Sequence, residues 1–202
     1  MGKSLGAAAG RPRHFRLHLA ASSPAVFRGR LRRFDRFVRR AIEAHSPKTR
    51  LISLDPEPRR EIDRLCDEVI RERLETVDLD LFDHLEAGDI LFIDGSHRCF
   101  MDSDVTVAFL DILPRLAPGV IVHFHDIFLP YDYPAAWGER YYSEQYLLAC
   151  FLLAETKLFR ILFPNWFIGR DAELTAVLDP LFTRPEMQGV EPRGGSFWLE
   201  IN

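Results

Sequence analysis

Three short apolar runs, each ending in an aspartate, decide the fold: Leu51-Ile-Ser-Leu-Asp55, Ile90-Leu-Phe-Ile-Asp94 and Val120-Ile-Val-His-Phe-His-Asp126. Continuous apolar runs of this length predict strands that are buried on both faces of a sheet. Helical patterns separate the runs, so we expect parallel strands joined by right-handed crossovers. Ligands bind just beyond the carboxyl ends of such strands. We therefore expect the three aspartates to converge on one edge of the sheet. Capping of the following turn is the alternative for any one of them, but it explains all three together poorly.

The periodicity of the remaining chain completes an α/β pattern. Apolar residues at three- and four-residue spacing predict helices, and short apolar runs predict strands. The predicted helices cover 31–45, 80–85, 102–116, 143–155 and 170–182. A further helix is predicted to start near Pro56 and to bury Ile62, Leu65, Cys66, Val69 and Ile70. The predicted strands cover 51–54, 74–77, 90–93, 120–125, 159–163 and 196–201, with a short one at 25–27. Pro114 should distort the end of the helix at 102–116. The pattern predicts one Rossmann-like, doubly wound and mostly parallel sheet.

Size and composition indicate a globular protein. The chain has 202 residues, of which 47% are hydrophobic, and this suits one domain with a substantial core. No apolar run approaches the roughly 18 residues that cross a membrane, and the first twenty residues lack the apolar block of a secretory signal. Cys66, Cys99 and Cys150 are scattered and odd in number, which favours reduced thiols in a cytoplasmic protein over disulfides or a zinc site.

Charge is unevenly distributed along the chain. Residues 1–50 hold 13 Lys and Arg but only two acids, Asp35 and Glu43. We predict a basic, poorly ordered head at 1–35, followed by an α/β domain at 36–202. A basic segment of this kind could contact nucleic acid, but no nucleic-acid-binding motif accompanies it. Nucleic acid and membranes are therefore not the expected partners, and homo-oligomerisation stays open.

Several motifs bear a closer resemblance. They are Leu91-Phe-Ile-Asp-Gly-Ser-His97, Pro118-Gly-Val-Ile-Val-His-Phe-His-Asp-Ile127, Tyr131-Asp-Tyr-Pro134, Tyr142-Ser-Glu-Gln-Tyr146 and Gly194-Gly-Ser-Phe-Trp198. Over residues 36–202 the chain resembles the class I S-adenosylmethionine-dependent methyltransferases. Within them it is similar to the small-molecule O-methyltransferases related to cephalosporin-biosynthesis and macrolide-sugar methyltransferases. The resemblance implies methyl transfer from S-adenosylmethionine to a hydroxyl of a small molecule.

The resemblance also implies roles for particular residues. Transfer to a hydroxyl requires that its oxygen be deprotonated or polarised and held in line with the methyl group. His97 matches the position of the general base in some relatives, and its usual pKa of about 6.5 suits that work. Asp94 is the second catalytic candidate. A hydrogen bond from His97 to its own turn is the structural alternative.

A divalent metal ion such as Mg²⁺ is a further implication, because hard oxygen ligands can hold an ion that orients the acceptor. The positions of the family's metal ligands fall on Asp94, His125 and Asp126. Several relatives have an acid where this chain has His125, and imidazole suits transition metals better than magnesium. His123 lies on the same strand face and is expected either to belong to the core or to lie directly behind the site residues.

The cofactor should contact a second group of acids. Asp55 matches the acidic residue that binds the ribose hydroxyls in the family, and Asp78 and Asp80 fall where relatives contact the adenine. The loop with Tyr131, Tyr133 and Trp137 is expected either to border the acceptor pocket or simply to pack against the helix from Ser143.

One family motif is missing. A Glu-x-Gly-x-Gly loop should precede the helix at 36–45, since its glycines let the backbone approach the cofactor. The chain has Phe27-Arg-Gly-Arg-Leu-Arg-Arg-Phe-Asp35 there, with Gly29 as its one glycine. The first strand and this loop are therefore predicted to be incomplete. The alternative function is a non-catalytic methyltransferase-fold protein, or a truncated or frame-shifted remnant with impaired cofactor binding.

Overall fold

The computed structural model describes residues 17–22, 31–57, 63–154 and 157–202, with side chains described from residue 36 onward. Its centre is a seven-stranded sheet of order β3-β2-β1-β4-β5-β7-β6. The first five strands of that order are parallel, whereas β7 runs antiparallel to both β5 and β6. The strands are β1 (Leu17–Ser22), β2 (Arg50–Leu54), β3 (Glu68–Ile70), β4 (Ile90–Asp94), β5 (Ile121–His125), β6 (Phe159–Pro164) and β7 (Ser196–Ile201). This architecture confirms the predicted Rossmann-like, class I methyltransferase fold.

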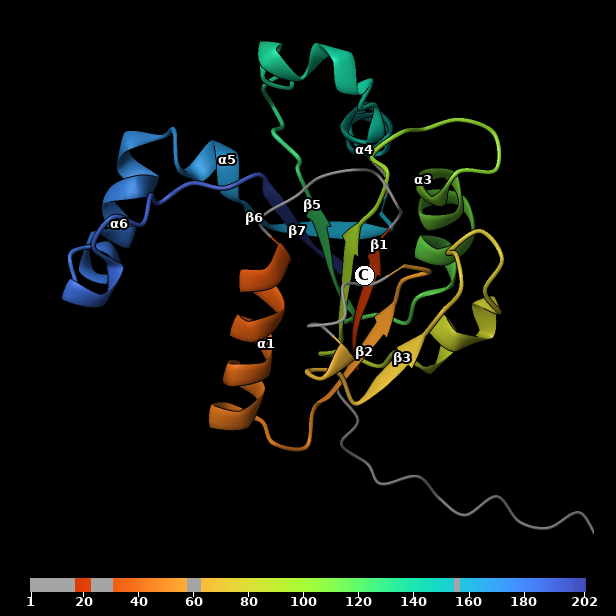
Figure 1. The fold of residues 1–202 in the computed structure, drawn as a ribbon. Coiled ribbons are helices and arrows are strands. Elements are labelled where there is room, and N and C mark those ends of the chain that lie inside the picture. The colour runs from red at the N-terminus through yellow and green to blue at the C-terminus, as the bar shows by residue number, and fades with distance from the viewer. Residues whose placement is uncertain (1–16, 23–30, 58–62, 155–156) are drawn as a thin grey trace, which may run out of the picture.

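Helical segments flank the sheet, with α1 on one side and α3 on the other (Figure 1). The α-helices are α1 (Leu31–His45), α3 (Asp104–Val107), α4 (Glu144–Leu153), α5 (Asn165–Ile168) and α6 (Ala172–Phe182). The other helical segments are η1 (Leu79–His84), η2 (Ala108–Ile112), η3 (Leu113–Arg115), η4 (Ala135–Arg140) and η5 (Pro185–Met187). The predicted helices at 31–45, 143–155 and 170–182 are confirmed within a few residues, and 80–85 is a 3₁₀ helix.

The helix predicted at 102–116 changes its winding along its length. It begins as α-helix in α3, continues as π-helix in η2 and ends as 3₁₀-helix in η3. Pro114 lies in the last of these segments, as expected of a residue without a backbone N–H to donate. On its inner face Phe109 stacks on Phe124 of β5, with ring centroids 4.9 Å apart.

Two strands differ from the sequence prediction. The third strand was predicted at 74–77, but β3 lies at 68–70 and takes in Val69 and Ile70, which had been assigned to a helix. Leu74 is buried in a turn instead, so its apolar character reflects packing and not a strand. The central strand β1 was not predicted at all. Its sequence, Leu-His-Leu-Ala-Ala-Ser, is short and rich in small residues, and hydrogen bonding to neighbours on both sides makes it a strand. The strand predicted at 25–27 and the helix start at 58–62 lie outside the described residues.

The strand order reverses direction between β1 and β4. Chain order moves outward from β1 through β2 to β3, and then returns to the other side of β1 for β4 and β5. Ligands of open α/β sheets bind in the crevice at such a point, beyond the carboxyl ends of the strands. The register aligns Ala21 of β1 with Leu54, and Ser22 with Asp94. Asp55 and Asp94 therefore lie at the same level, one on each side of β1.

Within the described residues, no helix is long and apolar enough to span a membrane. Most of the largest buried side chains belong to one hydrophobic cluster that includes Phe82, Phe109 and Phe124. Cys99 and Cys150 are exposed thiols.

Asp67 links three parts of the fold, and its replacement gives a first prediction. Its Oδ2 accepts hydrogen bonds from Leu51 N and from Arg39 Nη2, each at 2.7 Å. Asp67→Asn should lower the free energy of unfolding by about 1 kcal/mol at pH 7, because the amide oxygen can still accept both bonds but lacks the charge that strengthens them. Burial would raise the pKa of Asp67, but the bonds from Leu51 and Arg39 outweigh it, and the pKa is lowered.

The sign of that shift sets the pH dependence. A carboxyl whose pKa is depressed by folding stabilises the fold above its unfolded pKa and loses this effect as the pH falls through the folded value. Chemical unfolding of parent and variant should therefore differ at pH 7 and converge in acid. The control is Glu72→Gln, which alters an exposed acid nearby. A difference that is equally large at both pH values would contradict the argument.

Candidate active site

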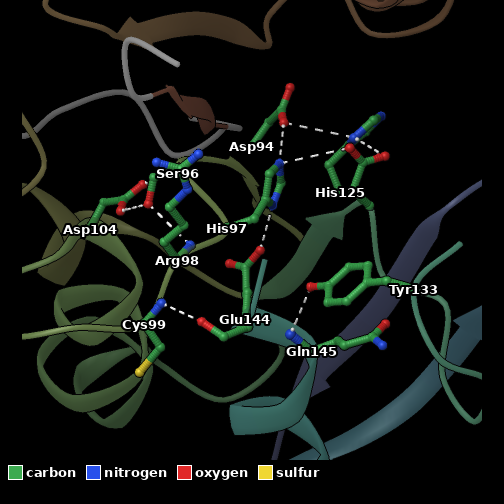
Figure 2. Close-up of polar contacts among 12 residues, drawn as sticks. Asp94, Ser96, His97, Arg98, Cys99, Asp104, His125, Tyr133, Glu144 and Gln145 are labelled. Carbon is green, nitrogen blue, oxygen red and sulfur yellow. Dashed lines mark hydrogen bonds and ion pairs between the residues drawn. The ribbon is translucent and has the colours of Figure 1, made fainter. Parts of the chain in front are cut away.

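Two aspartates meet at the carboxyl edge of the sheet. Asp94 is the last residue of β4, Asp126 directly follows β5, and these strands are parallel neighbours. Both carboxylates approach the same atom, Nε2 of His97, at 3.2 Å from Asp94 Oδ1 and 3.9 Å from Asp126 Oδ2. The convergence expected from the strand pattern is thus observed for Asp94 and Asp126, whereas Asp55 lies at the same edge on the other side of β1. Figure 2 shows the His97 ring standing between Asp94 and Glu144.

The turn that carries His97 is held by Asp104. Ser96 donates to Asp104 through both its backbone N–H and its hydroxyl. A Cβ on Gly95 would lie 2.1 Å from Asp104 Oδ2, so only glycine permits this approach. His97 itself has a φ of 57°, a left-handed conformation that costs energy for a residue with a side chain. The turn therefore places His97 at some cost in backbone strain.

Glu144 completes the site from the first turn of α4. Its Oε2 lies 2.7 Å from His97 Nδ1, and its side chain is fully buried. Glu144 belongs to the motif Tyr142-Ser-Glu-Gln-Tyr146, but no role was predicted for it from the sequence. The signal was available, because an acid and an amide, Glu144 and Gln145, open a helix whose next eight residues are otherwise mostly apolar.

The carboxylates change the acid–base character of His97. Burial alone would lower its pKa, but hydrogen bonds to Asp94 and Glu144 outweigh burial and raise the pKa well above the usual value. Burial raises the pKa of Glu144, against the opposing effect of its bond to His97. His97 is thus a stronger base than the free side chain. The usual pKa that the sequence analysis assigned to His97 does not apply.

His125 lies beside the two aspartates. Its Nδ1 is 3.2 Å from Asp126 Oδ1 and 3.7 Å from Asp94 Oδ1. Burial would lower the pKa of His125, but Asp126 and Asp94 raise it above the usual value. His123, on the same strand, is buried and stacks on Trp198 with ring centroids 4.3 Å apart, which confirms its assignment to the core.

The three predicted metal ligands, Asp94, His125 and Asp126, come together, but they do not fit a metal ion. The ring nitrogens of His97 and His125 face the carboxylates that would have to coordinate it. Across the residues that the structure describes, no group of three or more His, Cys, Asp or Glu side chains could hold a metal ion. We therefore derive no step of the chemistry through a metal.

The predicted cofactor residues lie in two different places. Asp55 is half-buried at the carboxyl end of β2, beside the crevice, and its Oδ1 accepts from Glu57 N at 2.9 Å. Asp78 caps η1 by accepting from Asp80 N, and Asp80 faces Arg115 at 3.8 Å. The contact of Asp55 with the ribose stays a prediction. The structure does not bring Asp78 or Asp80 to the Asp94 cluster, and their contact with adenine stays a prediction.

The aromatic loop packs against the start of α4. The hydroxyl of Tyr133 accepts from Gln145 N at 3.1 Å, and its ring lies within 6.4 Å of Trp137. Tyr142 brings this cluster to the site, since its ring centroid is 4.6 Å from that of His97. Packing on the helix is therefore observed, and the same cluster forms one side of the His97 environment.

Comparison with known proteins gives one match to a family model. A model described as a methyltransferase domain matches residues 32–127, a span that contains Asp94, His97 and Asp126. No curated protein matches the sequence. Together with the sheet topology, the family match supports a class I methyltransferase.

Two solved structures resemble the chain weakly. Both are mutants of the 16S rRNA (adenine(1408)-N(1))-methyltransferase from Catenulisporales acidiphilia. One is 13% identical with a TM-score of 0.44, covering 92% of this chain and 86% of that chain. The other is 12% identical with a TM-score of 0.38, covering 73% and 76%. Similarity at this level carries no argument about the function of this chain.

The approach of Gly95 to Asp104 yields a second prediction. Gly95→Ala should destabilise the protein by about 1–3 kcal/mol, because the new methyl group must displace the Asp104 carboxylate. Thermal and chemical unfolding would measure the loss. Gly138→Ala is the matched control, since a Cβ there meets nothing within 4 Å. Equal losses of stability in the two variants would show that the Asp104 carboxylate can move aside at little energetic cost.

Proposed function

We propose that this protein transfers a methyl group from S-adenosylmethionine to a hydroxyl oxygen of a small molecule. The observation that carries the proposal is the row Glu144–His97–Asp94, with Asp126 beside it, at the carboxyl ends of β4 and β5. This row lies at the carboxyl edge of the sheet, next to the point between β1 and β4 where the strand order reverses, and ligands of open α/β sheets bind at such a point. A strong, oriented base next to a ligand crevice suits deprotonation of a hydroxyl.

The cofactor supplies an electrophilic methyl group on a positively charged sulfur. The acids at the edge of the sheet suit such a ligand, because carboxylates attract a nearby cation. Asp55 would accept hydrogen bonds from the ribose hydroxyls while it keeps its bond from Glu57 N. These contacts use this chain's own residues and require no metal ion.

Exposure indicates how an acceptor would approach. The His97 side chain is 3% exposed, whereas those of Asp94 and Asp126 are 11% and 21% exposed. An acceptor hydroxyl would therefore meet the two aspartates first, with His97 Nε2 directly behind them. Asp94 and Asp126 orient the hydroxyl, and the Asp94–His97 pair takes its proton. The ring accepts this proton only after it has lost its own Nε2 proton, and the raised pKa of His97 therefore shifts turnover to a higher pH than an ordinary histidine would give.

Substitutions in the row test this function. Asp94→Asn and His97→Ala should each reduce methyl transfer by at least about 10²-fold, the contribution typical of acid–base groups, while circular dichroism shows a retained fold. Transfer of labelled methyl groups to a panel of hydroxylated small molecules would measure the rates. Asp83→Asn serves as control, since Asp83 is an exposed aspartate that pairs with Arg115. If the variants transfer methyl groups as fast as the parent, Asp94 and His97 only form the turn and the proposed catalytic roles are wrong.

A second candidate function is a methyltransferase fold without catalysis. The observation in its favour is the segment between β1 and α1, which has Gly29 as its only glycine. Cofactors of this size usually rest on a loop whose glycines allow close backbone approach. The carboxylate row argues against this candidate, because a protein without catalysis does not need a buried histidine between acids.

Cofactor affinity separates the two candidates. We expect the chain to bind S-adenosylmethionine about tens- to a thousandfold more weakly than a relative with the glycine loop, because several backbone hydrogen bonds are lost. Replacing part of residues 23–30 by a Glu-x-Gly-x-Gly segment should recover affinity in calorimetric titrations. Micromolar or tighter binding by the unmodified chain would show that this segment holds the cofactor in another way.

A further inference from the structure

We propose that Glu144 is the positioning residue of this site, and that it fixes the ring orientation and tautomer in which His97 accepts a proton. The expected effect on kcat rests on the proposed function, whereas the expected effect on the His97 tautomer does not. The sequence motifs assigned the base and the strand-end acids. They did not assign the group that holds the base.

The start of α4 forms hydrogen bonds with both the backbone and the ring of His97. The backbone N–H groups of Ser143 and Glu144 both donate to the carbonyl oxygen of His97, at 2.7 Å and 3.1 Å. The Glu144 side chain meanwhile reaches Nδ1 of the same residue at 2.7 Å. Backbone and ring of His97 are thus held by a single helical turn, which also stabilises the left-handed φ of 57°.

The Glu144 side chain has no other described polar contact. Its Oε1 is buried and lacks a hydrogen-bond partner within the described part of the chain, while Oε2 contacts His97. Gln145, the next residue, is equally buried but contacts the backbone instead, accepting from Phe128 N at 3.0 Å. A fully buried carboxylate with one partner is costly for stability. A purely structural role therefore explains Gln145 well and Glu144 poorly.

The chemistry of a carboxylate determines the tautomer. Ionised Glu144 can only accept a hydrogen bond, so Nδ1 of His97 must carry a hydrogen. In the neutral ring, Nε2 then presents its lone pair toward Asp94 and Asp126, where an acceptor hydroxyl would lie. The N-terminal end of α4 favours the negative charge of Glu144 in its first turn, and the bond to His97 acts in the same direction, against the burial that raises the pKa of Glu144.

The proton then has a defined path. As the acceptor oxygen forms its bond to the methyl carbon, the bond between that carbon and sulfur breaks, and the hydroxyl proton moves to Nε2. The ring becomes an imidazolium that donates through Nδ1 to Glu144 and through Nε2 to Asp94. Glu144 stabilises this ion, so its removal weakens the base as well as releasing the ring.

The test compares Glu144→Gln and Glu144→Asp with the parent. The Gln side chain can donate to Nδ1 and so permits the opposite tautomer, whereas Asp keeps the charge on a shorter arm. We would record ¹⁵N-detected NMR of ligand-free protein with labelled histidine across a pH titration, up to a pH at which the His97 ring is neutral. There we expect His97 to carry its hydrogen on Nδ1 in the parent, and a mixture of tautomers in Glu144→Gln. We expect kcat to fall about tenfold to a thousandfold in Glu144→Gln with KM changed less than threefold, and Glu144→Asp to recover part of the loss.

Gln145→Ala is the matched control, because it removes a neighbouring buried polar side chain that does not contact His97. It should leave the His97 tautomer as in the parent. An unchanged tautomer together with an unchanged kcat in Glu144→Gln would overturn the proposal, and so would a rise in KM at constant kcat. If the parent transfers no methyl group, the proposed function fails, and the NMR comparison still decides the role of Glu144. If Glu144→Gln does not fold, Glu144→Asp decides it: a His97 tautomer and kcat no different from those of Gln145→Ala would overturn the proposal.

Discussion

The burial of one imidazole among three carboxylates is the constraint on which the site depends. His97 is almost inaccessible, and Asp94, Asp126 and Glu144 approach it from β4, from the turn after β5 and from α4. A buried histidine of this kind requires partners on both nitrogens. The requirement ties together segments that lie up to 47 residues apart in the sequence. The orientation of α4 on the sheet is therefore part of the chemistry and not merely of the packing.

The strands that hold these acids were predictable because their signals are local. A parallel strand buried on both faces is apolar throughout, and a turn residue follows it, so three of the strands and their aspartates could be found by inspection. Strands β1 and β3 were missed for a physical reason. Leu17–Ser22 is a strand because β2 and β4 bond to it on both sides. Glu68–Ile70 has three residues, which is too short for any periodicity to emerge.

The same distinction separates the predicted part of the site from the rest. Asp94 and His97 belong to one turn, and Asp126 ends the neighbouring strand, so topology alone placed them together. Glu144 reaches the site only through the path of the chain after β5, which no local pattern describes. His125 was expected among metal ligands, and nothing in the sequence indicated that its ring would face Asp126. Sequence reasoning supplied the residue types, and it could not supply their relative orientation.

The two halves of the proposed chemistry depend on different parts of the sheet. Proton handling belongs to β4, β5 and α4, whose side chains form one continuous set of contacts. Cofactor binding belongs to the ends of β1 and β2, where Asp55 stands near the crevice and the segment after β1 contains a single glycine. Because β1 separates the two halves, weak cofactor affinity would not disturb the geometry of His97. Conversely, the acids around His97 attract the sulfonium through charge, an interaction that does not require a close backbone approach. The contacts that hold His97 can therefore stay intact while the affinity for the methyl donor varies. Cofactor binding and proton transfer thus depend on different parts of the same fold.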